Sequence, residues 1–171
     1  MNKPFALLLA CVLLIAAVGC DTHNVIKKET KLYNFDSYSE GNIRAQSQGK
    51  GLNGQLLNEL QLTFGAKKIP LTHEMYAEDG RGNISYMFYI RGNPQQYINL
   101  HVFTDEQERI KRIHNWYGDQ NRIDSQNMHT VIYSHNRASL IYTSSGKDKG
   151  IYDKQVHEVF NSLLNRMDFN Q

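Results

Sequence analysis

Three strand-like segments, separated by short polar turns, follow one another in the middle of the chain. They constrain the fold more than any other feature. Residues 83–91 and 97–103 have the period of two that is typical of strands with one buried face, and residues 69–77 are also predicted to form a strand. Only the short turn-like segments 78–82 and 92–94 separate them. Connections this short have no room for the crossover helices of a parallel sheet, so we expect an antiparallel meander.

Helical patterns lie on both sides of this meander. Residues 52–64 place leucines and a phenylalanine at helical spacing, and Gly65 follows where a left-handed C-cap belongs. Thr104 and Gln107 have the form of a capping box, which predicts that a second helix begins there and ends near Gly118. The predicted apolar face of this second helix consists of Ile110, Ile113 and Tyr117.

The last third of the chain predicts a hairpin and a final helix. Residues 130–134 and 138–143 are rich in strand formers and are joined by the turn 135–137. Asp153 is placed to cap a helix with an apolar stripe. That stripe consists of Val156, Val159, Phe160, Leu163, Leu164 and Met167.

The order of these segments, α-β-β-β-α-β-β-α, predicts the fold class. We expect a single α+β domain over residues 46–171, with a five-stranded antiparallel sheet and helices packed on one face. The other face of the sheet would carry several of the ten Tyr residues of the chain. These residues are either ordinary strand formers or part of a binding surface.

The N-terminus carries the pattern of an export signal. Lys3 supplies a positive charge, and residues 5–18 follow without a charged or amide side chain. The apolar run from 4 to 19 is shorter than the roughly 20 residues that a membrane-spanning helix needs. We therefore predict a signal that is removed rather than a membrane anchor helix.

The end of this run, Ala17-Val18-Gly19-Cys20, resembles the lipobox of bacterial lipoproteins. The resemblance covers residues 1–21, and it implies that residues 1–19 are removed and that Cys20 becomes a lipid-bearing N-terminus. The lipid would be a diacylglyceryl group with acyl chains such as palmitate. Residues 20–45 would then be the lipidated Cys and a tether or extended segment. An ordinary secretory signal that happens to contain a Cys is the alternative.

Cysteine usage favours lipidation. The chain has two Cys residues, and Cys11 would leave with the signal, so an unmodified Cys20 would be a single reactive thiol in an exported protein. The resemblance places the protein on the extracytoplasmic face of the cell membrane, with the lipid bilayer as its first partner through Cys20.

Charge and short motifs exclude several classes of function. The chain has 19 Lys and Arg, one of them in the signal, against 17 Asp and Glu, and the two signs are interspersed, so we expect no nucleic-acid partner. The glycines of Gly49-Lys50-Gly51-Leu52-Asn53-Gly54 lack the preceding apolar strand of a dinucleotide site. The pair Ser144 and Lys147 lacks the other motifs of penicillin-binding proteins. Lys147 and Lys149 lie between glycines, where they could meet an anionic headgroup or an acid of a partner.

Seven His residues occur without the spacing of a metal site, so we predict no metal, no cofactor and no catalytic residue. The leading hypothesis is a membrane-anchored, non-enzymatic binding or regulatory module of the bacterial cell envelope, with an envelope protein or the wall as its partner. Two alternatives stay open. One is a small extracytoplasmic hydrolase that uses His101 or His135, and the other is a structural component of an envelope or coat complex.

Overall fold

The computed structural model describes residues 54–79 and 81–164. The predicted signal, Cys20 and the predicted tether lie outside these residues, as do Gly49, Gly51 and Met167. The described part contains α4 (Gly54–Ala66), β1 (Leu71–Glu78), β2 (Ile84–Ile90), β3 (Asn93–Val102), α5 (Glu106–Tyr117), β4 (Arg122–Asp124), β5 (Met128–His135), β6 (Ala138–Ser145), the 3₁₀ turn η2 (Gly146–Asp148) and α6 (Asp153–Leu163).

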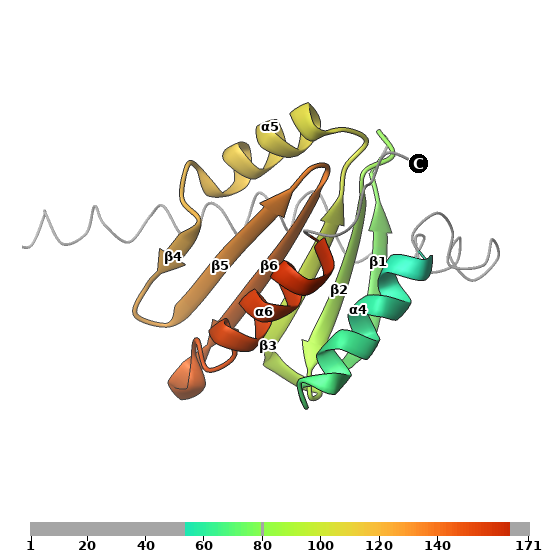
Figure 1. Ribbon diagram of the computed structural model, residues 1–171. Coiled ribbons are helices and arrows are strands. Elements are labelled where there is room, and N and C mark those ends of the chain that lie inside the picture. Colours follow the sequence, from blue (N-terminus) through green and yellow to red (C-terminus); the bar gives the residue numbers. More distant parts are fainter. Residues whose placement is uncertain (1–53, 80, 165–171) are drawn as a thin grey trace, which may run out of the picture.

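The strands form one antiparallel sheet in the order β1-β2-β3-β6-β5-β4 (Figure 1). The predicted α+β class, the meander and the later hairpin are confirmed. The prediction of five strands was wrong, because β4 adds a sixth strand at the edge beside β5. This strand has only three residues, two of them charged, and is too short for an alternating pattern to be recognised in the sequence.

Two-residue turns join β2 to β3 and β5 to β6. Ile90 pairs with Asn93, which leaves Arg91 and Gly92 as the turn between β2 and β3. Both turn residues have positive φ, 54° and 74°, as expected for the turn type that matches the twist of two antiparallel strands. The turn is therefore shorter than the predicted segment 92–94, and β3 begins at Asn93.

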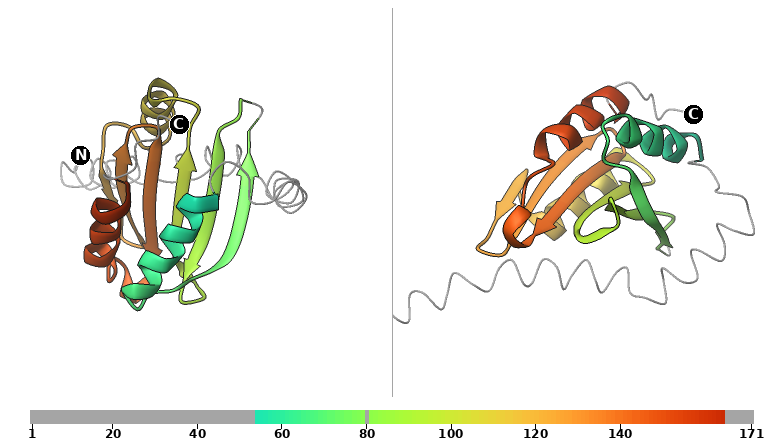
Figure 2. Two further views of the ribbon diagram at one scale, coloured as in Figure 1. Left: turned by 45° about the vertical axis from the view of Figure 1, so that its right-hand side comes forward. Right: turned by 90° about the horizontal axis from the view of Figure 1, so that it is seen from below.

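The larger core lies between the sheet and the helices α4 and α6, which lie on the same face of the sheet (Figures 1 and 2). The predicted apolar stripe of the last helix is confirmed over its described residues, because Val156, Val159, Phe160, Leu163 and Leu164 are all buried in this core. From the sheet, alternate residues such as Leu140 and Tyr142 of β6 contribute to it.

The opposite face of the sheet is covered in part by α5, so the prediction that all helices pack on one face was wrong. Ile113, Trp116 and Tyr117 of α5 form a second core with sheet residues that include Ile132 and Ile141. Ile141 lies between two residues of the larger core, so its side chain points to the other face. An apolar stripe shows that a helix is covered on one side, but it does not show which face of the sheet covers it.

The helix ends differ in detail from the sequence prediction. Gly65 is a residue of α4, and the left-handed position after the helix is Lys68, with φ of 62°. The amides of Lys68 and Ile69 donate to the carbonyls of Gly65 and Phe64, at 2.9 and 3.1 Å, which is the Schellman pattern. Ile110 was predicted to lie on the buried face of α5, but it is 47% exposed.

The N-cap of α5 is Asp105 rather than Thr104, because the Asp105 carboxylate accepts the amide of Glu108 at 2.8 Å. Asp153 is the first residue of α6 rather than its cap, and Tyr152 occupies the cap position. The Asp153 carboxylate has other partners, which belong to the cluster described next.

Candidate functional site

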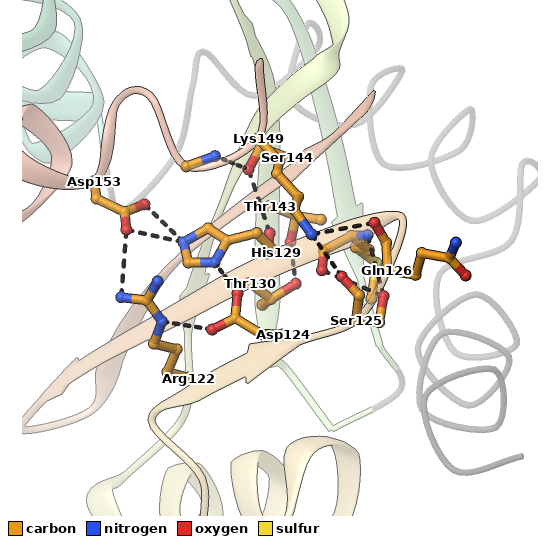
Figure 3. Close-up of polar contacts among 12 residues, drawn as sticks. Arg122, Asp124, Ser125, Gln126, His129, Thr130, Thr143, Ser144, Lys149 and Asp153 are labelled. Carbon is orange, nitrogen blue, oxygen red and sulfur yellow. Dashed lines mark hydrogen bonds and ion pairs between the residues drawn. The ribbon is translucent and has the colours of Figure 1, made fainter. Parts of the chain in front are cut away.

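A group of charged side chains and a buried His contact one another where β4, β5 and α6 meet (Figure 3). We call Arg122, Asp124, His129 and Asp153 the His129 cluster. Arg122 and Asp124 come from β4, His129 from the second residue of β5, and Asp153 from the first residue of α6. Asp124 is paired with His129 in the register of β4 and β5.

His129 is 2% exposed and lies between two carboxylates. Its Nδ1 is 2.5 Å from Oδ1 of Asp124, and its Nε2 is 2.8 and 2.9 Å from the two oxygens of Asp153. Arg122 donates from Nε to Asp124 at 2.7 Å and lies 3.6 Å from Asp153. Each carboxylate therefore faces both His129 and Arg122.

The contacts place two side chains that carry nitrogen atoms, His129 and Arg122, against two carboxylates. Carboxylate oxygens accept hydrogen bonds from such groups. The hydrogen bond from His129, followed by that from Arg122, holds the pKa of Asp124 below its ordinary value.

The backbone around His129 is tied down by the segment that connects β6 to α6. Gly150 has a φ of 76°, a backbone conformation that favours glycine, and it lies beside the imidazole of His129. The amide of Gly150 donates to Oγ of Ser144 at 2.8 Å. Lys149 Nζ donates to the carbonyls of Ser125 and Gln126 at 2.7 and 3.1 Å, which joins the same segment to the loop before β5.

The cluster is suited to holding segments together rather than to proton transfer. A general base needs a ring nitrogen that can reach a substrate proton. Both nitrogens of His129 already face carboxylates, and the ring is buried. The arrangement therefore joins the edge of the sheet to the beginning of α6 through hydrogen bonds between charged groups.

The two His residues proposed for a hydrolase lie in different settings. His101, on β3, is 1% exposed, with Nδ1 2.6 Å from Oγ of Ser85 and its ring 5.2 Å from the ring of Trp116. His135 ends β5 beside the turn to β6 and is half-buried. The second core thus covers His101, whereas His135 lies at the end of a hairpin.

The other residues singled out in the sequence do not form one site. Ser144 is buried at the end of β6, whereas Lys147 is exposed in η2, and Gly54 begins α4. Among the sheet tyrosines, Tyr86 and Tyr142 belong to the larger core, whereas Tyr89 and Tyr97 are half-buried in a cross-strand pair. No group of His, Cys, Asp and Glu that could hold a metal ion occurs among the residues described.

The sequence prediction missed the His129 cluster altogether. Asp124 precedes His129 by 5 residues and Asp153 follows it by 24, and no known motif has this spacing. The only sequence sign is the concentration of charge at residues 122 and 124, directly before a strand.

Comparison with known proteins gives no match. No protein family model, no curated protein and no solved structure matches the chain. Within residues 54–79 and 81–164, none of the helices combines the length and the apolar character needed to cross a bilayer.

Proposed function

We propose that the protein is a lipid-anchored, non-enzymatic binding or regulatory module of the bacterial cell envelope, held on the extracytoplasmic face of the cell membrane through Cys20. The observation that carries the proposal is the sequence Ala17-Val18-Gly19-Cys20 at the end of a charge-free apolar run. Two acyl chains on Cys20 would make the attachment durable, because one chain alone gives only marginal, reversible binding.

A binding role is favoured over catalysis by the state of the buried polar groups. The two ring nitrogens of His129 face Asp124 and Asp153, and His101 lies under Trp116. Neither imidazole is placed to take a proton from a substrate in this conformation. The small α+β domain would then act through its surface, on a partner in the envelope or the wall.

Replacing the proposed lipid acceptor tests the anchor. We expect Cys20→Ala protein to leave the membrane fraction or to stay in the cytoplasm as uncleaved precursor. Cys11→Ala is the matched control, because this residue belongs to the segment that we propose is discarded. Mass spectrometry of the wild-type protein should find a diacylglyceryl thioether on an N-terminal Cys20. An unmodified thiol, or a retained residue 1–19 segment, would refute the anchor.

A hydrolase is the second candidate, because Oγ of Ser85 and Nδ1 of His101 lie 2.6 Å apart, within reach of proton transfer. Both side chains are 1% exposed, so a substrate could reach them only after α5 had moved. We expect the mature lipidated protein to show no turnover of ester, peptide or wall substrates. Turnover that Ser85→Ala abolishes in a folded protein, and that His135→Ala leaves intact, would establish the hydrolase instead.

A further inference from the structure

One end of the molecule gathers basic side chains on three neighbouring connections. We call Lys68, Arg91, Lys147 and Lys149 the basic end. Lys68 lies between α4 and β1, Arg91 lies in the turn between β2 and β3, and the other two lie between β6 and α6. All four are exposed, and their connections lie at the lower end of the view in Figure 1.

Hydrogen bonds join these connections into one surface. The amide of Arg91 donates to the carbonyl of Pro70, next to β1, at 2.8 Å. Nε2 of Gln96, near the start of β3, donates to the carbonyl of Asp148 in η2 at 3.0 Å. The four bases therefore project from a framework whose parts are held relative to one another.

The charge of this surface is not balanced locally. None of the four bases forms an ion pair with an acid of the described ranges, and Asp148 is the one acid within the connections 67–70, 91–92 and 146–152. The ammonium of Lys149 is held by two carbonyl oxygens, which orient it but leave its charge in place. Lys67, their neighbour, is the exception and pairs with Glu158.

At the opposite end of the sheet, three arginines are paired with acids. Arg112 contacts Asp79 and Glu108, at 3.4 and 2.7 Å, and Arg81 lies 3.6 Å from Glu108. Arg109 contacts Glu106 at 2.9 Å. The charges of these three arginines are therefore offset by neighbouring acids, whereas the bases of the basic end form no such pairs within the described ranges. The whole chain has a formal charge of only +2.

We propose that the basic end is an interaction surface for the anionic headgroups of the bilayer that holds Cys20. This proposal rests on the lipid anchor proposed above. An anchored domain stays near the membrane, and anionic lipid attracts each nearby Lys or Arg with a free energy that corresponds to about fivefold in binding. Ile151 is 49% exposed beside these bases and can enter the interfacial region. The domain would then lie with this end toward the lipid and with α5 away from it.

A pair of fluorescent labels tests this orientation in the full lipidated protein. Gln126→Cys places a label on the loop before β5 at the basic end, and Asn115→Cys places one on α5; both positions are exposed and uncharged. With Cys20 lipidated and Cys11 removed, the new Cys is the single free thiol. The vesicles contain phosphatidylcholine, with or without phosphatidylglycerol, and a headgroup spin label that quenches nearby fluorophores.

We expect phosphatidylglycerol to increase quenching at position 126 and not at position 115. Because headgroup attraction is electrostatic, molar salt should remove the increase. With the label at position 126, Lys147→Gln should weaken the preference for phosphatidylglycerol vesicles about fivefold. Lys111→Gln, which changes an exposed base of α5, should leave this preference unchanged. Equal quenching at 126 in both vesicles, stronger quenching at 115, or equal effects of the two Lys variants would refute the proposal.

Failure of the anchor gives a different result. A chain without lipid on Cys20 would carry a second thiol and would not float with phosphatidylcholine vesicles. Flotation with phosphatidylglycerol vesicles then tests the basic end alone. A loss of flotation in Lys147→Gln but not in Lys111→Gln would support this surface, and equal flotation of both variants would refute it.

Discussion

His129 is buried, and both of its ring nitrogens face carboxylates. This one residue of β5 therefore connects β4, through Asp124, with α6, through Asp153. The ring lies between Asp124 and Asp153, and Arg122 lies within ion-pair distance of both carboxylates. Hydrogen bonds to charged groups contribute more than neutral ones, and removing one member of a buried set leaves the others without their partner.

We expect His129→Ala to lower the free energy of unfolding by about 2 to 3 kcal/mol, since it leaves a cavity and brings two carboxylates face to face. His114→Ala is the matched control, because His114 pairs with one Asp on the surface, and its side chain is 58% exposed. The control should change stability by less than about 0.5 kcal/mol. Urea unfolding of both variants measures the difference, and equal losses would contradict the role assigned to the cluster.

The dependence of the free energy of unfolding on acidic pH should report the contact between His129 and Asp124. Because the folded pKa of Asp124 lies below its ordinary value of 3.8, the unfolded chain takes up this proton first as the pH falls. The stability that Asp124 contributes is therefore complete above the unfolded pKa and is lost as the pH falls through the folded pKa. In His129→Ala the folded pKa moves back toward 3.8, so the gap in stability between the variant and the wild type should narrow in acid.

At the scale of the elements, the chain shows where local rules predict structure and where they do not. The sequence predicted all three described helices and five of the six strands, because each has an apolar repeat with turn residues on either side. It missed β4, which is an element only through its pairing with β5. It also placed the N-cap of α5 at Thr104, one residue too early, and it took Asp153 for the N-cap of α6, of which Asp153 is the first residue. Thr and Asp are both residue types that can cap a helix, so the sequence alone does not distinguish these positions.

The N-cap of α5 can be tested directly. Asp105→Ala should lower the free energy of unfolding by about 1 kcal/mol, because the amide of Glu108 loses its acceptor. Thr104→Ala, one residue away and also exposed, should have a much smaller effect, since its hydroxyl does not cap the helix. Urea unfolding of the two variants distinguishes them. A larger loss for Thr104→Ala would restore the cap that the sequence suggested.

For the whole molecule, the positions of the strands predict a gradient of local stability. β3 and β6 are paired on both edges and contribute to the larger core, whereas β4 is a three-residue edge strand. We expect amide hydrogen exchange to be slowest in β3 and β6 and fastest, among the strands, in β4. Exchange in β4 as slow as in β3 would show that the His129 cluster makes this edge as stable as the centre.

The spatial relations of the whole molecule were the hardest to predict from the sequence. The face on which α5 packs depends on tertiary contacts, and so does the meeting of Asp124, His129 and Asp153, because neither leaves a periodic signal in the chain. The sequence indicated two bases of the basic end, Lys147 and Lys149. That Lys68 and Arg91 lie at the same end of the molecule follows only from the fold.

The pairing of β3 with β6 at the centre of the sheet affects the time at which the chain can fold. The hydroxyl of Tyr142 donates to Gln96, which lies 46 residues earlier in the sequence, at 2.5 Å, and α6 must follow before the larger core closes. A nascent chain that ends before residue 138 has the meander but lacks β6, so β3 is paired only with β2. Loop closure over such a distance is slow, so the larger core can close only after β6 and α6 have been synthesised.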